Sequence, residues 1–292
     1  MKRIFTFLAG AIALLINFTS GAQQNKTDNK SLLWRITGKH MAKPSYLFGT
    51  MHQICKDDYI WTDKMKASLE NSEKVCFEMD MDDPGVMMSV ASGLIDKSGK
   101  QLKDYFTPEQ YKLVTQYVKD SLGMDIAMFQ QMKPVMLQTM MGLSEAKCKD
   151  AVSYEETIIK TAQATNKEVL GLEEPQEQLS ALETIPTDSV ISAVLEEVTG
   201  HKKDETDDYA KLINAYKEQD ITALYRYITE SKSIGDDMGP FLDVRNKKWI
   251  PRMAKKMDKS SVFFAVGAGH LWGDHGVINL LRKDGYKVEA VK

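Results

Sequence analysis

The sequence predicts an α/β protein with a mixed, mostly parallel sheet covered by helices and a large helical insertion between two sequence-distant groups of strands. Three observations support this fold class. Short apolar runs lie between residues 32 and 79 and again between residues 262 and 291. The segment between them has the hydrophobic period of helices. The apolar run near residue 265 lacks polar alternation, which is typical of a strand buried on both faces of a sheet.

The first strand group contains a hairpin and a third strand. Residues 32–36 and 45–50 have the composition of strands, and Gly38 and Pro44 mark a turn between them. A helical segment at residues 66–72 then leads into an apolar strand at residues 75–79, which carries Glu78 inside it. We therefore expect an antiparallel pair followed by a buried strand with one carboxylate.

The central part of the chain is predominantly helical, with an insertion over about residues 84–165. Thr107 followed by Pro108 is a typical helix start, because Thr caps the first turn and Pro lacks the N–H that would be unpaired there. We expect residues 31–292 to form a single domain that includes this insertion. The remaining elements are a strand at residues 169–174, a second helical block at 175–257, a strand at 262–267, a helix at 277–283 and a last strand at 287–291.

Residues 1–22 have the features of a secretory signal peptide. Two basic residues precede an apolar run at residues 4–16, and the small residues 20–22 form a cleavage pattern. The apolar run is shorter than the roughly 20 residues that span a bilayer as a helix. Residues 23–30 are polar and predict a flexible leader. We therefore expect a periplasmic or secreted protein with no stable membrane anchor after the signal is cleaved.

The charge balance argues against a nucleic-acid partner. The chain has 38 Lys and Arg against 41 Asp and Glu, a net charge of −3, whereas nucleic-acid phosphates require a basic face. Neither a Gly-rich phosphate loop nor a Gly-x-Ser-x-Gly motif occurs, which argues against nucleotide-dependent enzymes and serine hydrolases. Nothing in the sequence indicates the oligomeric state.

Three cysteines, Cys55, Cys76 and Cys148, leave at least one without an intrachain partner. In an oxidising compartment Cys55 can pair with Cys76 or with Cys148, and three buried thiols are also compatible with the sequence. Their spacing does not match a zinc-binding pair of cysteines.

Two Gly-x-x-His motifs are the main candidates for chemistry. Each follows an apolar strand, and they end at His52 and His270. Glycine permits a tight turn, after which the imidazole can project into the crevice beyond the strand ends. Glu78 and Glu173 lie in similar settings, and two imidazoles with one carboxylate are a ligand set of catalytic divalent metals. Alternatively, Glu78 forms a structural ion pair with Arg245 or Lys74, and each histidine caps a turn.

These motifs and several shorter segments carry a family resemblance. The segments are residues 33–38, 45–52, 77–80, 171–173 with Gln178, Arg245 with Asn246, 266–271, and Gly285 with Tyr286. They resemble the TraB/GumN family, which is related to the Tiki proteases, over residues 32–292. The resemblance implies an extracytoplasmic or membrane-associated hydrolase with Mn, Co or Zn as the metal and peptide bonds as the substrate.

The resemblance also implies roles for individual residues. His52 and His270 would be metal ligands, and Glu78 would be a ligand or a general base. Glu173, Arg245 and Asn246 would be further residues of the pocket. An arginine fork there would be suited to hold a substrate carboxylate or a developing oxyanion.

We therefore expect a metal-dependent hydrolase, in particular a peptidase, that acts on a peptide or another small extracytoplasmic substrate. Two alternatives remain open. One is a binding module for haem, metal or a hydrophobic peptide that performs no catalysis. The other is an interaction protein of the cell envelope with a decayed site.

A run of methionines in the helical insertion has a separate interpretation. Met124, Met128, Met132, Met136 and Met140 recur every four residues and would form a stripe on one helix if the helix tolerated a proline at position 134. Core packing is the favoured interpretation, and an apolar substrate groove or a copper(I) site are the alternatives.

Overall fold

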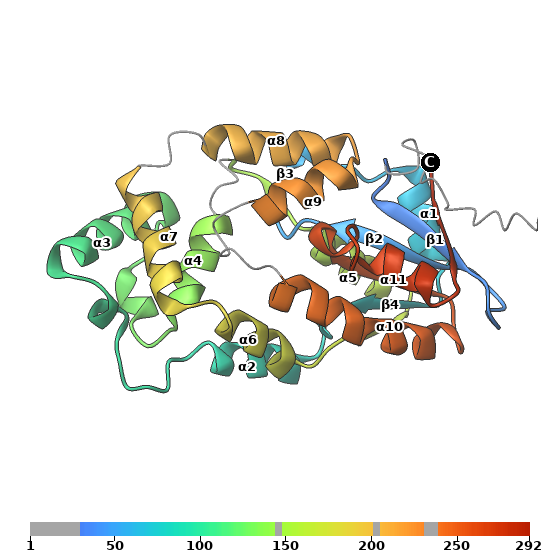
Figure 1. The fold of residues 1–292 in the computed structure, drawn as a ribbon, viewed down its shortest axis with the longest axis horizontal. Helices are drawn as coiled ribbons and strands as arrows, with labels where there is room; N and C mark the ends of the chain where they lie inside the picture. Colours follow the sequence, from blue (N-terminus) through green and yellow to red (C-terminus); the bar gives the residue numbers. More distant parts are fainter. Residues whose placement is uncertain (1–29, 144–147, 201–204, 231–238) are drawn as a thin grey trace, which may run out of the picture.

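A six-stranded mixed sheet organises the part of the chain that the structure describes (Figure 1). The structure is a computed structural model, and it describes residues 30–143, 148–200, 205–230 and 239–292. The expected signal peptide, residues 1–22, and residues 23–29 of the expected leader lie outside these ranges. Helices flank the sheet, so the predicted α/β class with a mostly parallel sheet is confirmed.

The strands of the sheet are β1 Leu33–Thr37, β2 Ser45–Thr50, β4 Lys74–Phe77, β6 Glu168–Gly171, β7 Val262–Gly267 and β8 Lys287–Ala290. Their order across the sheet is β6-β4-β7-β2-β1-β8. β6, β4, β7 and β2 pair in parallel, whereas β1 runs antiparallel to β2 and to β8. The predicted hairpin is therefore confirmed as the pair of β1 and β2.

β7 occupies the interior of the sheet, between β2 and β4. It contains no polar side chain, and its first five residues are buried, as expected for a strand with helices on both faces. Gly267 at its end pairs with Thr50 of β2, and Phe77 of β4 pairs with Gly171 of β6. The carboxyl ends of these four parallel strands therefore meet along one edge, where α/β sheets commonly hold their ligands.

Glu78 lies just beyond β4 and not inside a strand, which corrects the sequence interpretation. β4 ends at Phe77, and the Glu78 carbonyl accepts hydrogen bonds from the N–H groups of both Leu172 (3.0 Å) and Glu173 (2.8 Å). Two donors on one carbonyl interrupt the regular pattern of hydrogen bonds between β4 and β6, so the alternation of side chains along β4 ends at Glu78. The Glu78 carboxylate can therefore turn toward the end of β7, where the Gly267 N–H donates to Oε1 (2.8 Å).

Six helices pack with the sheet around the main core. They are α1 Asp63–Asn71, α5 Tyr154–Ala164, α8 Glu205–Lys217, α9 Ile221–Glu230, α10 Val244–Met257 and α11 Val277–Lys283. In the view of Figure 1, α10 and α11 lie in front of the sheet and α5 lies behind it. On α10 the buried residues Arg245, Trp249, Met253 and Met257 recur every four positions, which makes one face of this helix point inward. This face delivers Arg245 to the sheet edge.

A second group of helices forms a separate buried cluster, seen at the left of Figure 1 around α3, α4 and α7. The helices of this part are α2 Pro84–Gly93, α3 Pro108–Leu122, α4 Pro134–Leu143, α6 Pro175–Glu183 and α7 Thr187–Thr199. The expected start of α3 is confirmed: the Thr107 hydroxyl accepts a hydrogen bond from the Gln110 N–H, and the Gln110 side chain accepts one from the Thr107 N–H. Within the described ranges, no helix is both long and apolar enough to cross a membrane.

Short helical turns connect these elements. They are η1 Lys56–Asp58, η2 Leu102–Tyr105, η3 Ile126–Phe129 and η6 Ala268–His270, and η5 Gly239–Asp243 is a π-helix.

The five methionines do not share one helix, which corrects the predicted stripe. α3 ends at Gly123, which has a left-handed φ of 65°, and α4 begins only at Pro134, so Met128 lies in η3 between them. Met124, Met132 and Met140 pack against the second buried cluster, which confirms core packing for these three. The Met128 side chain is exposed.

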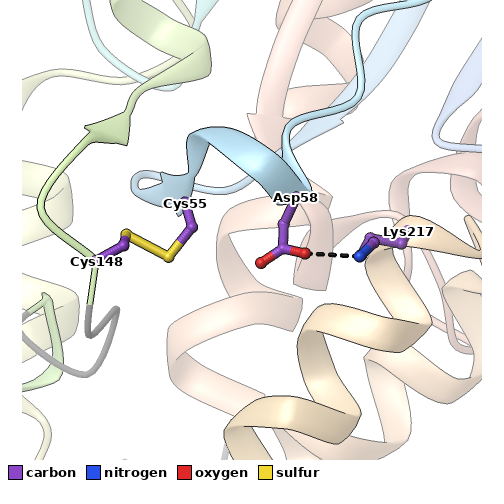
Figure 2. The surroundings of a disulfide bond; sticks show 4 residues. All are labelled: Cys55, Asp58, Cys148 and Lys217. Atoms are coloured by element: carbon purple, nitrogen blue, oxygen red, sulfur yellow. Dashed lines mark hydrogen bonds and ion pairs between the residues drawn. A yellow bond between two sulfur atoms is a disulfide. The ribbon is translucent and has the colours of Figure 1, made fainter.

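A disulfide joins Cys55 to Cys148 across 93 residues of chain (Figure 2). Cys55 belongs to β3 Ile54–Cys55, which pairs antiparallel with β5 Ala151–Val152. Cys76 is a buried free thiol, so the alternative pairing of Cys55 with Cys76 is not formed. The bridge fastens the segment that follows His52 to the segment that leads into α5.

Candidate active site

His270 reaches the sheet edge at the end of β7, in the turn η6. Its side chain is 4% exposed, and its ring lies 4.4 Å from the Trp249 ring, centroid to centroid. His270 Nδ1 lies 2.6 Å from Asn246 Oδ1. On the other side of the ring, Arg245 Nη1 lies 3.3 Å from His270 Nε2. Arg245 and Asn246, two consecutive residues in the first turn of α10, therefore contact the two nitrogens of this imidazole.

These contacts fix the tautomer of His270. The Asn246 amide nitrogen donates to the His275 carbonyl (2.9 Å), which leaves Oδ1 of the same amide as the acceptor that faces His270. Nδ1 of His270 must then carry the proton. Nε2 is then unprotonated, and its one lone pair accepts from the Arg245 guanidinium, a contact that a metal ion at Nε2 would replace. Burial lowers the pKa of His270 to about 3, and the imidazole is neutral at pH 7.

Arg245 joins the two predicted carboxylates. Its Nη2 donates to Glu78 Oε2 and to Glu173 Oε1, each at 2.6 Å, and its Nε lies 3.1 Å from both Glu173 oxygens. Nη1 faces His270 and the Phe241 carbonyl (3.4 Å). All five N–H groups of the guanidinium therefore face acceptors within the protein, and none points to a substrate.

The structural ion pair that the sequence left open is thus present between Glu78 and Arg245. The other candidate partner, Lys74, instead pairs with Glu168 at 2.6 Å. Burial disfavours the charged form of Glu78, but the charges around it and the Gly267 N–H outweigh burial and hold its pKa at about 2. Because His270 is neutral at pH 7, the positive charges that act on Glu78 there are those of Arg245 and His52.

Glu173 lies deeper than Glu78. Its side chain is 2% exposed, and the Trp249 indole N–H donates to Oε2 (3.0 Å) in addition to the Arg245 contacts. Asn246 is buried as well. Neither residue lines the cavity at the sheet edge, so both support the residues that do.

His52 approaches the same cavity from the end of β2. Its side chain is 67% exposed, and Nδ1 lies 3.2 Å from Glu155 Oε1. That oxygen also accepts a hydrogen bond from the Thr50 hydroxyl (2.7 Å), and the Ser153 hydroxyl donates to Oε2 (2.9 Å). The hydrogen bond with Glu155 raises the pKa of His52 above its usual value.

Glu155 was not found from the sequence. It is the second residue of α5, and Ser153 caps that helix by accepting a hydrogen bond from the Glu156 N–H. A serine followed by acidic residues indicates a helix start and nothing more. Only the folded chain shows that one of these acids turns inward and holds His52.

The cavity at the sheet edge has a volume of about 350 Å³. It brings together four of the predicted residues, His52, Glu78, Arg245 and His270, together with Gln178, whose amide donates to Glu78 Oε2 (3.2 Å). Apolar side chains of α8 and α9 form another wall. The cavity is therefore a polar corner with apolar surroundings, as is usual for ligand sites.

The donor atoms of Glu78 and His270 fit one divalent cation. Glu78 Oε1 and His270 Nε2 lie 3.8 Å apart, close to the separation of roughly 3 to 4 Å expected for two ligands with bonds of about 2 Å to one ion. Glu78 and Glu173 share the single guanidinium of Arg245 in this buried group, and burial raises the pKa of Glu173. Among the described residues, however, no three His, Cys, Asp or Glu side chains lie close enough to hold an ion. His52 therefore faces this pair across the cavity without completing a ligand set.

Comparison with known proteins decides the family. A profile of the TraB/PrgY/gumN family matches residues 32–290, almost the whole of the described chain. The chain belongs to this family. The predicted resemblance is thereby confirmed, and family membership extends from β1 to β8.

Three curated relatives of this TraB/PrgY/gumN protein are named as metalloproteases. The chain is 24% identical to Metalloprotease TIKI2 of Danio rerio over 320 aligned positions, which cover 91% of this chain and 62% of that protein. It is 24% identical to Metalloprotease TIKI1 of Danio rerio, with coverages of 92% and 65%. Identity to Metalloprotease TIKI1 of Homo sapiens is 22%, with coverages of 90% and 62%.

The chain thus spans a little under two thirds of the length of these relatives. No solved structure matches the chain.

Proposed function

We propose that this TraB/PrgY/gumN protein is an extracytoplasmic, metal-dependent hydrolase that cleaves peptide bonds in the cavity at the sheet edge. The observation that carries the proposal is a neutral imidazole beside an ionised carboxylate, His270 Nε2 and Glu78 Oε1, on the wall of this cavity. The metalloprotease names of the relatives support the reaction class.

Glu78 and His270 would hold the metal ion, with His52 as the third ligand from across the cavity. The ion, for which Mn, Co and Zn are candidates, would supply a Lewis acid. The low pKa of Glu78 suits a ligand better than a general base, because an efficient base has a pKa near the working pH.

The residues behind the cavity act by positioning. Arg245 and Glu173 hold the Glu78 carboxylate, while Asn246 holds His270 in the tautomer that presents Nε2. Such outer contacts fix the orientation of ligating side chains and typically affect metal affinity by about 10- to 100-fold when removed. In this arrangement the substrate would be oriented by cavity residues other than Arg245.

Two features support an extracytoplasmic location. Residues 1–22 have the pattern of a signal peptide, and the chain contains a disulfide between Cys55 and Cys148. Disulfides persist in oxidising compartments such as the periplasm or the extracellular space. We propose that the signal is cleaved and that no membrane anchor remains.

The test compares metal binding and peptide cleavage in four variants of the protein without residues 1–22. His52→Ala, Glu78→Gln and His270→Ala should lose cleavage of an unstructured peptide, measured by mass spectrometry after dialysis against EDTA and addition of Mn²⁺, Co²⁺ or Zn²⁺. His40→Ala is the matched control, because His40 is exposed in the turn between β1 and β2. Its metal content and cleavage rate should equal those of the wild type.

The proposal fails if the wild type binds no metal at a one-to-one ratio and cleaves no peptide, or if the three site variants remain as active as His40→Ala. A hydrolase that works equally well in EDTA would also refute the metal role.

A second candidate, peptide binding without turnover, is favoured by the apolar walls of the cavity. It would be recognised by tight peptide binding that His270→Ala leaves unchanged, with no cleavage under any metal condition.

A further inference from the structure

A second cavity, of about 480 Å³, lies between α4, α6 and α7 and joins the cavity at the sheet edge. The two share His52, Gly142, Gln178 and Phe241 among their lining residues. Two of these shared residues belong to the polar corner, since Gln178 donates to Glu78 and His52 is the predicted ligand. A molecule bound at the polar corner can therefore extend into the adjoining second cavity.

The walls of this second cavity are mostly apolar. Val135, Leu182, Ala193 and Val194 contribute from three helices, and Ile185 contributes from the turn between α6 and α7. Within the described part of the chain, no lysine or arginine lines it, and the one cationic group on its wall is His52, at the end shared with the first cavity. Its volume lies within the range of about 300 to 1,000 Å³ typical of ligand pockets.

One carboxylate lines the second cavity and is already engaged. Glu197 accepts a hydrogen bond from the Tyr117 hydroxyl (2.8 Å). Its negative charge disfavours an acidic guest in the same space, because like charges repel strongly where water is excluded. The cavity therefore favours uncharged, apolar groups over acidic ones.

Gly142 lies at the junction of the two cavities. It belongs to the last turn of α4, and a Cβ atom built on it would meet no atom of the described residues within 4 Å. Glycine inside a helix costs about 1 kcal/mol relative to alanine. Position 142 thus borders both cavities without a side chain.

We propose that the second cavity is a specificity subsite that receives a large apolar side chain of a peptide substrate, such as leucine, phenylalanine or methionine, through the gap at Gly142. Its place beside a scissile bond rests on the proposed peptidase function. The preference for an apolar side chain does not, because binding can be measured without turnover.

The experiment uses dye-labelled seven-residue peptides that differ only at the central position, which is Leu, Phe, Ala or Glu in an otherwise polar sequence. Dissociation constants are measured by fluorescence anisotropy in EDTA, where metal-dependent cleavage does not occur. The wild type should bind the Leu and Phe peptides at least about tenfold more tightly than the Ala peptide, since filling an apolar pocket with a few methylenes typically discriminates by about 10- to 200-fold. The Glu peptide should bind no better than the Ala peptide.

Two variants close the subsite by different routes. Gly142→Leu places a side chain in the junction and improves the helix propensity of α4, so a loss of folding is not expected. Ala193→Phe fills the cavity from α7. Both should reduce the preference for Leu over Ala to less than about threefold, as expected when the apolar pocket can no longer accept the guest. Ser192→Phe is the matched control for the second variant, because Ser192 is exposed and lines neither cavity.

The outcomes separate this inference from the proposed function. An equal affinity of the wild type for all four peptides, or an unchanged preference in Gly142→Leu and Ala193→Phe, overturns the subsite even if peptides are cleaved with metal present. A preference that both variants remove, in a protein that cleaves no peptide with any metal, supports the subsite and refutes the peptidase. A preference that Ser192→Phe also removes would overturn the assignment to this cavity.

Discussion

Replacing Arg245 with methionine should destabilise the protein by about 3 to 5 kcal/mol at pH 7.5, because breaking a buried ion pair from one side leaves uncompensated charge. The direction agrees with the structure, because the positive charges around Glu78, that of Arg245 among them, hold its pKa at about 2, below the ordinary value of 4.5. Glu78 is 13% exposed and Glu173 is 2% exposed, so water screens neither carboxylate effectively.

The deficit should shrink as the pH falls. In the wild type the lowered pKa of Glu78 stabilises the fold above pH 4.5, and this contribution is lost between pH 4.5 and pH 2. In Arg245→Met, burial without the guanidinium raises the pKa of both carboxylates, so they become protonated, and their repulsion disappears, as the pH falls below neutral. Both effects bring the two proteins closer in stability at low pH.

Urea denaturation followed by circular dichroism in EDTA, at pH 7.5 and at pH 4, measures this difference. Arg252→Met on the same helix is the control: Arg252 pairs with Glu177 at 2.7 Å but is 38% exposed, and partly exposed pairs contribute at most about 1 kcal/mol. A loss below about 1 kcal/mol in Arg245→Met at pH 7.5 would contradict the account. So would a loss that is the same at both pH values.

Three further predictions concern the rest of the structure. Replacing Cys55 and Cys148 with serine should lower the free energy of unfolding by about 2 to 4 kcal/mol, measured by thermal or chemical denaturation, because the bridge closes a loop of 93 residues; an unchanged stability would show that the bridge does not form in solution. Burial raises the pKa of Cys76 to about 12. Its thiol should therefore not react with Ellman's reagent at pH 8 until the protein is unfolded. Rapid labelling of the native protein would contradict the burial of Cys76. Asn246→Ala should weaken metal binding by about 10- to 100-fold. Asn246→Asp should retain more of the affinity, because an oxygen acceptor for the N–H of His270 remains. Isothermal titration with Zn²⁺ measures both variants, and affinities equal to that of the wild type would contradict the positioning role of Asn246.

The parts of the fold set by local patterns were predictable. The apolar run at residues 262–267 has no polar alternation, and it is the strand buried on both faces. Thr107 and Pro108 mark the start of α3 as expected. The methionine spacing does not correspond to one helix, because a period of four residues does not show whether the helix is continuous, and Gly123 and Pro134 interrupt it.

The candidate site was predictable in its main residues and not in their connections. Glycine followed by histidine at a strand end indicates a side chain at the sheet edge, but which strands are neighbours depends on long-range pairing. Glu155 and the role of Arg245 could not be derived, since both depend on which side chain fills a buried space between distant elements. The disulfide partner of Cys55 was open for the same reason.

The place of β7 between β2 and β4 has a consequence for biogenesis. β7 is made late, yet it fills a gap between two strands that are made early. Until it arrives, β2 and β4 each expose an unpaired edge, which is prone to associate with other chains. His52 and Glu78 likewise have no His270 beside them until residue 270 has been made. A chain that stops before β7 therefore cannot assemble the site, because both the centre of the sheet and this histidine are missing.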